Sequence, residues 1–150
     1  MNSFKFNQWF VLLVVFALSP LSIAAKYPQV LTDYVAAAKK ATPSASLEQF
    51  KTAIDDPEIL IIDVREPDEY AAGHVRNAIN IPRGVIEFQI WNAVGYPDKI
   101  NMDQKMYLYC KSGGRCALAA KALRDLGFTE VYRAELKIKE WVEAGNALVK

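Results

Sequence analysis

Apolar residues in this chain form short continuous runs, and the segments between the runs alternate apolar and polar residues at helical spacing. The clearest run is Ile59-Leu60-Ile61-Ile62, in which β-branched residues dominate. Continuous runs of this kind are typical of strands that are buried on both faces of a parallel sheet. The pattern predicts four strands, over residues 59–62, 78–81, 105–109 and 130–132.

The segments between the runs carry the end signals of helices. Ser46 is followed three residues later by Gln49, which is the spacing of a capping box at a helix start. Pro67 suits a first helical turn, and Gly127 suits a left-handed helix exit. The predicted helices span residues 27–40, 46–54, 67–70, 84–93, 115–126 and 138–143.

Two of these helices carry apolar residues that are expected to be buried. In the helix over 84–93, Val85 and Phe88 should point inward, with Trp91 as a further candidate. The helix over 27–40 is expected to lie on the domain, because apolar residues recur along it at helical spacing. Those residues are Val30, Leu31, Tyr34, Val35 and Ala38.

Strands that alternate with helices predict an α/β fold with a mainly parallel sheet. Ligands of such folds bind beyond the carboxyl ends of the strands. Asp63 follows the run over 59–62, and Cys110 follows the run over 105–109. The two residues are therefore expected at the same edge of the sheet.

The first 24 residues have the features of a secretory signal peptide. They carry one cation, Lys5, then an unbroken apolar stretch over 9–18, and small residues at Ser22 and Ala24. Cleavage is expected after Ala24, with Ala25 as the second choice. The alternative is an uncleaved membrane anchor, but the apolar stretch is short for a span of about 20 residues. An N-terminal helical extension over 25–45 and a domain over 46–150 would follow.

Charge and metal-ligating residues exclude two classes of function. The chain has 18 lysine and arginine residues against 17 aspartate and glutamate residues, and removal of Lys5 with the signal peptide makes them equal. Without a basic tract, nucleic acid is not an expected partner. One histidine and two cysteines cannot fill a four-ligand zinc site. No metal, no cofactor and no membrane contact of the mature chain are expected, and the protein is expected to be a monomer.

The strongest chemical signal is the segment Cys110-Lys111-Ser112-Gly113-Gly114-Arg115-Cys116. It joins a predicted strand to a predicted helix, so Cys110 should lie among backbone N–H groups at a helix N-terminus, beside two cations. These groups favour the thiolate and should lower the pKa of Cys110 below about 8.5. The pattern predicts a nucleophile for anionic substrates.

Two stretches of the chain resemble the rhodanese (sulfurtransferase) family. One is Asp63-Val64-Arg65-Glu66-Pro67-Asp68-Glu69-Tyr70, which continues through Gly73-His74-Val75 to Ala78-Ile79-Asn80-Ile81-Pro82. The other is the loop from Cys110 to Arg115, and the resemblance covers roughly residues 46–149. The chain is most similar to the small, single-domain, periplasmic type found in bacteria. The resemblance implies a three-layer α/β sandwich with a mainly parallel five-stranded sheet flanked by helices.

The resemblance also implies an activity. Cys110 would accept a sulfane sulfur from thiosulfate or a related donor, become a persulfide, and pass the sulfur to a thiophilic acceptor such as cyanide or a thiol. One alternative is a periplasmic persulfide carrier that binds an exported thiol protein. A weaker alternative is a thiol-disulfide or arsenate-type reductase that uses Cys110 and Cys116.

Other residues of the motifs have two interpretations each. Arg115 would orient the loop by bonding its carbonyls, or attract thiosulfate. Lys111 would recruit the anionic donor, or be an ordinary exposed lysine. Cys116 would be a small buried residue, or a resolving thiol that attacks the persulfide.

His74 is expected to make a structural hydrogen bond. Asp63 is expected to be a buried acceptor that fixes nearby loops, and Arg65 its ion-pair neighbour.

Two comparisons with the family pattern bear on the substrate. Related phosphatases and arsenate reductases use a loop one residue longer between the cysteine and the arginine, so the loop here favours sulfur over phosphate. Family members usually carry a Gly-Gly pair before the last helix, where this chain has Ala134-Glu135-Leu136-Lys137. The segment beside the active loop is therefore expected to have a different shape, with an effect on substrate preference.

Overall fold

The computed structural model describes residues 27–150, so the predicted signal peptide lies outside the described residues. Among the residues it describes, no helix has the length and apolar character needed to cross a membrane. The strands are β1 (Ser44–Ala45), β2 (Leu60–Asp63), β3 (Ala78–Asn80), β4 (Met106–Cys110) and β5 (Val131–Lys137). The helices are α1 (Gln29–Ala41), α2 (Leu47–Ala53), α3 (Pro67–Ala72), the 3₁₀ turn η1 (Arg83–Val85), α4 (Ile86–Ala93), α5 (Gly114–Asp125) and α6 (Ile138–Glu143).

The five strands form one sheet in the order β1-β5-β4-β2-β3, and every pair is parallel. This confirms the predicted α/β fold with a five-stranded sheet. Strand β1, which pairs with β5 at one edge, was not predicted, because two residues are too few to show a hydrophobic period.

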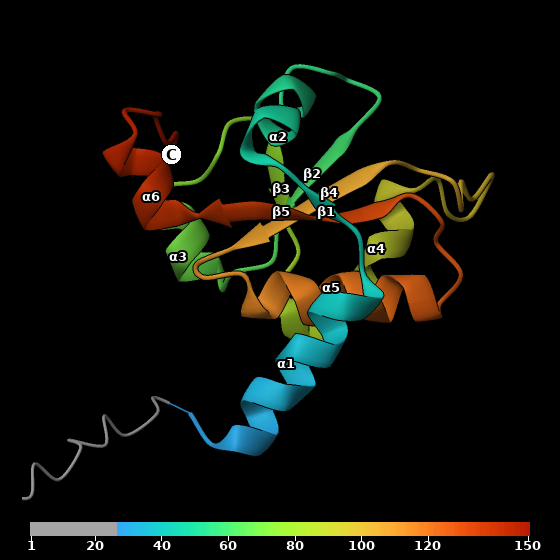
Figure 1. Cartoon of the computed structure of the whole chain (residues 1–150). Coiled ribbons are helices and arrows are strands. Elements are labelled where there is room, and N and C mark those ends of the chain that lie inside the picture. The colour runs from blue at the N-terminus through green and yellow to red at the C-terminus, as the bar shows by residue number, and fades with distance from the viewer. Residues whose placement is uncertain (1–26) are drawn as a thin grey trace, which may run out of the picture.

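Helices cover both faces of the sheet, so the molecule has three layers (Figure 1). Side chains of a strand alternate between the two faces, and β4 shows this clearly. Leu108 and Cys110 pack with residues of α4 and α5, whereas Tyr107 and Tyr109 pack on the opposite face with residues of α2 and α6. The alternation places the Cys110 side chain on the α5 side of the sheet.

The residues of α4 that face the core differ from those predicted. Phe88 is 82% exposed, while Ile86 and Ile90 are fully buried. The reason is that the segment begins with a 3₁₀ turn and the α-helix starts only at Ile86. The inward face therefore follows the four-residue spacing from Ile86 to Ile90. Trp91 is half-buried and packs against Phe128.

Helix α1 begins two residues after the predicted start at residue 27, ends one residue after the predicted end at residue 40, and contacts α5. Its apolar positions are not all covered, which corrects the expectation of a helix lying on the domain along its whole length. Ala38 is buried, whereas Val30 is 77% exposed and Tyr34 is also exposed. The N-terminal end of α1 extends away from the layers (Figure 1), so only its C-terminal part is packed.

Strand β5 is longer than the three residues predicted, and it runs directly into α6. Its last residue, Lys137, pairs with Cys110, after an irregularity in the register between Leu108 and Cys110. The segment that lacks the family's glycine pair is therefore strand with an irregular register beside the cysteine.

Candidate active site

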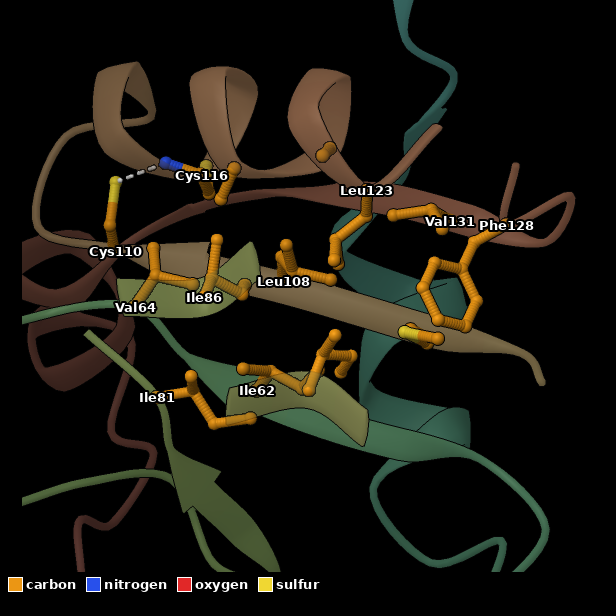
Figure 2. Close-up of a cluster of buried hydrophobic side chains, with 14 of the residues drawn as sticks. Ile62, Val64, Ile81, Ile86, Leu108, Cys110, Cys116, Leu123, Phe128 and Val131 are labelled. Carbon is orange, nitrogen blue, oxygen red and sulfur yellow. Dashed lines mark hydrogen bonds between the residues drawn. The ribbon is translucent and has the colours of Figure 1, made fainter. Parts of the chain in front are cut away.

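Cys110 is the last residue of β4 and lies at the carboxyl edge of the sheet. Only 1% of the residue is exposed, and it belongs to a cluster that includes Val64 and Ile86. Figure 2 shows its sulfur at the margin of this cluster, pointing toward the start of α5. The sulfur thus lies where an apolar surface meets the end of a helix.

Backbone N–H groups surround the sulfur as the sequence predicts. The Gly113 amide lies 3.1 Å from the Cys110 sulfur and the Cys116 amide lies 3.4 Å from it. Gly113 precedes the first residue of α5 and has a φ of 87°, a left-handed conformation that glycine adopts without strain. The turn therefore directs the free N–H groups of the helix start at one atom, where they stabilise an anion.

The thiol of Cys116 is a further donor. It is fully buried and donates to the Gly113 carbonyl oxygen at 3.4 Å, and it also interacts with the Cys110 sulfur. A thiolate is the stronger acceptor of the two. The bond from the Cys116 thiol, followed by the backbone N–H groups, lowers the pKa of Cys110 to about 6 against the opposing effect of burial.

The same contact makes Cys116 a poor nucleophile. Its hydrogen bond with Cys110, together with burial, raises the pKa of the Cys116 thiol well above its usual value. Both cysteines are free in the structure. Because the nucleophilic form of cysteine is the thiolate, the raised pKa favours a role for Cys116 as a hydrogen-bond donor over the resolving thiol, which was one of its two interpretations.

If Cys116 is a hydrogen-bond donor to Cys110, the reactivity of the Cys110 thiol should depend on pH in a specific way. Alkylation of Cys110 by iodoacetamide should rise with pH through a midpoint near 6. In Cys116→Ala the midpoint should rise by about one pH unit, since a hydrogen bond to a charged group contributes about 1.5 kcal/mol or more. Cys116→Ser, which keeps a donor, is the control. An unchanged midpoint in Cys116→Ala would show that the backbone alone stabilises the thiolate.

Arg115 does not bond the carbonyl groups of the loop, which was one of its two interpretations. Its guanidinium lies 2.5 and 3.0 Å from the two carboxylate oxygens of Glu69 in α3, and 3.8 Å from Glu66. The hydrogen bond with Arg115 is the main cause that lowers the pKa of Glu69. Arg115 thus fastens the start of α5 to α3, and its charge is compensated. Glu69 was quoted in the family motif but was given no role, because the pairing joins residues 46 positions apart.

Two lysines lie at the opening of the loop. Lys111 is exposed and directly follows Cys110. Lys39 of α1 was not predicted as a site residue, yet its Nζ lies 3.8 Å from the point where a Gly113 side chain would begin. No pattern in the sequence shows this proximity, because it depends on the packing of α1 against α5.

Asp63 and Arg65 form a buried ion pair next to the site. The Arg65 guanidinium lies 2.6 Å from the Asp63 carboxylate and donates a second bond, of 2.8 Å, to the Gly73 carbonyl. The backbone N–H of Arg65 also donates to Asp63. Asp63 is paired in register with Tyr109, whose side chain lies on the face opposite Cys110. The Asp63–Arg65 ion pair therefore joins the loop after β2 to the end of α3 and does not contact the Cys110 sulfur.

His74 makes the structural contacts that were expected of it. Its Nδ1 lies 3.1 Å from the Tyr70 carbonyl oxygen, and its ring stacks on the Tyr70 ring.

Within residues 27–150 no group of three or more histidine, cysteine, aspartate or glutamate side chains is placed to hold a metal ion.

Comparisons with known proteins agree with this geometry. Residues 46–144 match the family described as Rhodanese-like domain. The chain is 33% identical over 100 residues to the putative sulfur carrier protein YrkF of Bacillus subtilis, covering 66% of this chain and 50% of that protein. It is 40% identical over 93 residues to the tRNA uridine(34) hydroxylase of Hamiltonella defensa, covering 62% of this chain and 26% of that protein.

Among solved structures, the polysulfide-sulfur transferase homodimer of Wolinella succinogenes is similar with a TM-score of 0.61 and 30% identity. The similarity covers 80% of this chain and 87% of that one. The chain spans half or less of the length of the two curated relatives above, and their names describe different activities. The match over 46–144, the parallel sheet and the cysteine loop together show that the chain belongs to the rhodanese-like domain family.

Proposed function

We propose that the protein is a sulfurtransferase that moves a sulfane sulfur from thiosulfate, or a related anionic donor, to a thiophilic acceptor such as cyanide or a thiol. The observation that carries the proposal is the cage around Cys110, in which two backbone N–H groups lie within 3.4 Å of the sulfur. The thiol of Cys116 adds a third donor.

In the first step the Cys110 thiolate attacks the outer sulfur of thiosulfate. A bond forms between the two sulfurs, the sulfur–sulfur bond of thiosulfate breaks, and sulfite leaves with the electron pair. In the second step the acceptor attacks the terminal sulfur of the Cys110 persulfide, and the Cys110 thiolate leaves. Cyanide becomes thiocyanate, and a thiolate becomes a persulfide.

The geometry serves both steps without a general base. A pKa of about 6 makes Cys110 largely a thiolate at neutral pH, so no proton has to be removed during attack. Fixed N–H donors stabilise negative charge without reorganising as the charge forms. Since the thiolate is the attacking group in one step and the leaving group in the other, the same donors assist both.

Lys111 is the exposed cation that would attract an anionic donor. Its replacement by glutamine should raise the KM for thiosulfate about twofold to fivefold, the range expected of one exposed charge, with little change in kcat. Initial rates at several salt concentrations would measure this, and the difference between the two proteins should shrink as salt rises. An unchanged KM at low salt would remove Lys111 from donor binding.

A persulfide carrier is the second candidate, because one relative is named a putative sulfur carrier protein and the Cys110 residue is only 1% exposed. A shielded persulfide would react slowly with small acceptors and transfer its sulfur only to a protein partner that binds at the site. Steady-state transfer to cyanide separates the two candidates. Persulfide that forms quickly but turns over very poorly, and that is released by an exported thiol protein, would favour the carrier.

We further propose export to the periplasm through cleavage after Ala24, on the basis of the N-terminal sequence pattern. Cell fractionation and N-terminal sequencing of the native protein test this. Periplasmic protein that begins at Ala25 is the expected result, whereas uncleaved protein in the membrane fraction would contradict it.

A further inference from the structure

A groove of about 670 Å³ runs between α1 and the cysteine loop. Leu31, Val35 and Lys39 lie on successive turns of α1 and all line the groove. The groove therefore runs from apolar lining, made by Leu31 and Val35 together with Leu118 of α5, to Lys39 and Lys111 beside the loop, where the Lys39 Nζ lies close to Gly113. The volume lies within the range of small-molecule sites. Because α1 precedes the matched segment 46–144, this wall lies outside the part of the chain that defines the family.

The two ends of the groove differ in charge. Neither Lys39 nor Lys111 forms an ion pair within residues 27–150. The third cation at this end, Arg115, is compensated by Glu69. The loop end of the groove therefore keeps two uncompensated positive charges beside the cysteine loop, while the end at Leu31 offers apolar surface.

From this arrangement we propose that the groove binds an organic thiol with an apolar body as the sulfur acceptor, its thiolate lying between Lys39 and Lys111 and its carbon chain along Leu31, Val35 and Leu118. This inference rests on the proposed sulfur transfer and names its acceptor class. Cyanide would leave the apolar end of the groove unfilled. An acceptor with an anionic head and an apolar chain matches the charge at one end and the surface at the other.

The chemical step is the second half of the transfer. The thiolate of the acceptor attacks the terminal sulfur of the Cys110 persulfide, a new sulfur–sulfur bond forms, and the bond to Cys110 breaks. Cys110 leaves as the thiolate held by its N–H donors, and the acceptor leaves as an alkyl persulfide. Sulfur is only transferred, so no external oxidant or reductant is needed.

The length of the acceptor's chain tests the inference. Cys110 is loaded with sulfur from thiosulfate, and its discharge by straight-chain thiols from ethanethiol to hexanethiol is followed by intact mass. Each rate is divided by the rate of the same protein with cyanide. The relative rate should rise about twofold to threefold per methylene, as expected when each CH₂ enters a partly open apolar site. Equal rates for ethanethiol and hexanethiol would overturn the proposal, and so would faster discharge by glutathione, a larger polar thiol.

Two variants of neighbouring residues on α1 locate the effect. Leu31 lines the groove and is 39% exposed, whereas Val30 is 77% exposed and does not line it. Leu31→Asp should flatten the dependence on chain length, and Val30→Asp should leave it as in the wild type. Equal flattening in both variants would contradict the assignment to the groove.

Lys39→Gln tests the charged end separately. Discharge by every thiol should slow by about twofold to fivefold, with the dependence on chain length preserved, because the thiolate loses one cation while the apolar wall is intact. Failure of the wild type to form any persulfide would overturn both this inference and the proposed function. A persulfide that discharges without regard to chain length would overturn this inference alone.

Discussion

Replacement of Cys110 by alanine should abolish sulfur transfer from thiosulfate to cyanide, with a loss of about 1,000-fold or more. The sulfur is the atom on which the loop converges, since the amides of Gly113 and Cys116 lie within hydrogen-bond distance of it. No other described residue holds a thiolate there, because the pKa of the Cys116 thiol is raised well above its usual value. Thiocyanate formation measured under steady-state conditions gives the result directly.

Cys116→Ala is the matched control for this prediction. It removes a sulfur from the same loop but keeps the nucleophile, so transfer should persist, with its pH dependence moved upward. Circular dichroism of both variants should match that of the wild type, which would exclude loss of the fold. Substantial turnover by Cys110→Ala would remove Cys110 from the mechanism.

Replacement of Asp63 by alanine should lower the free energy of unfolding by about 3–5 kcal/mol, the range found when one member of a buried ion pair is removed. Asp63 is fully buried and accepts from both the side chain and the backbone N–H of Arg65. Without the carboxylate, the Arg65 guanidinium keeps its bond to Gly73 and its contact with the Tyr109 ring, but it remains a buried charge without its carboxylate partner.

Urea unfolding monitored by tryptophan fluorescence measures this loss. Asp55→Ala is the control, because it breaks the exposed Asp55–Arg76 pair and should leave the midpoint close to that of the wild type. The slope of the transition should be the same in all three proteins, so that a changed midpoint reports stability. An Asp63→Ala midpoint equal to that of Asp55→Ala would show that the buried pair contributes little.

The sequence predicts the parts of this molecule that depend on local pattern. The buried strand before Cys110 was predicted from its unbroken apolar run, and the amide cage from the two glycines before a helical segment. The error at Phe88 shows the limit of periodicity, because a 3₁₀ turn before Ile86 changes which residues face inward. Strand β1 was missed because a two-residue strand has no period to detect.

Contacts between distant segments could not be predicted in this way. The pairing of Arg115 with Glu69 spans 46 residues, and the position of Lys39 near Gly113 depends on how α1 packs on α5. Both depend on the tertiary arrangement rather than on the local pattern. Lys39, which is proposed to bind the acceptor thiolate, is therefore a residue that the sequence alone does not reveal.

The intact mass of the purified protein after incubation with thiosulfate shows whether Cys110 accepts a sulfur atom. We expect a gain of one sulfur atom, located at Cys110 by peptide mapping, lost when cyanide is added and absent in Cys110→Ala. A protein that gains no sulfur, or gains it on Cys116 instead, would show that Cys110 is not the sulfur acceptor.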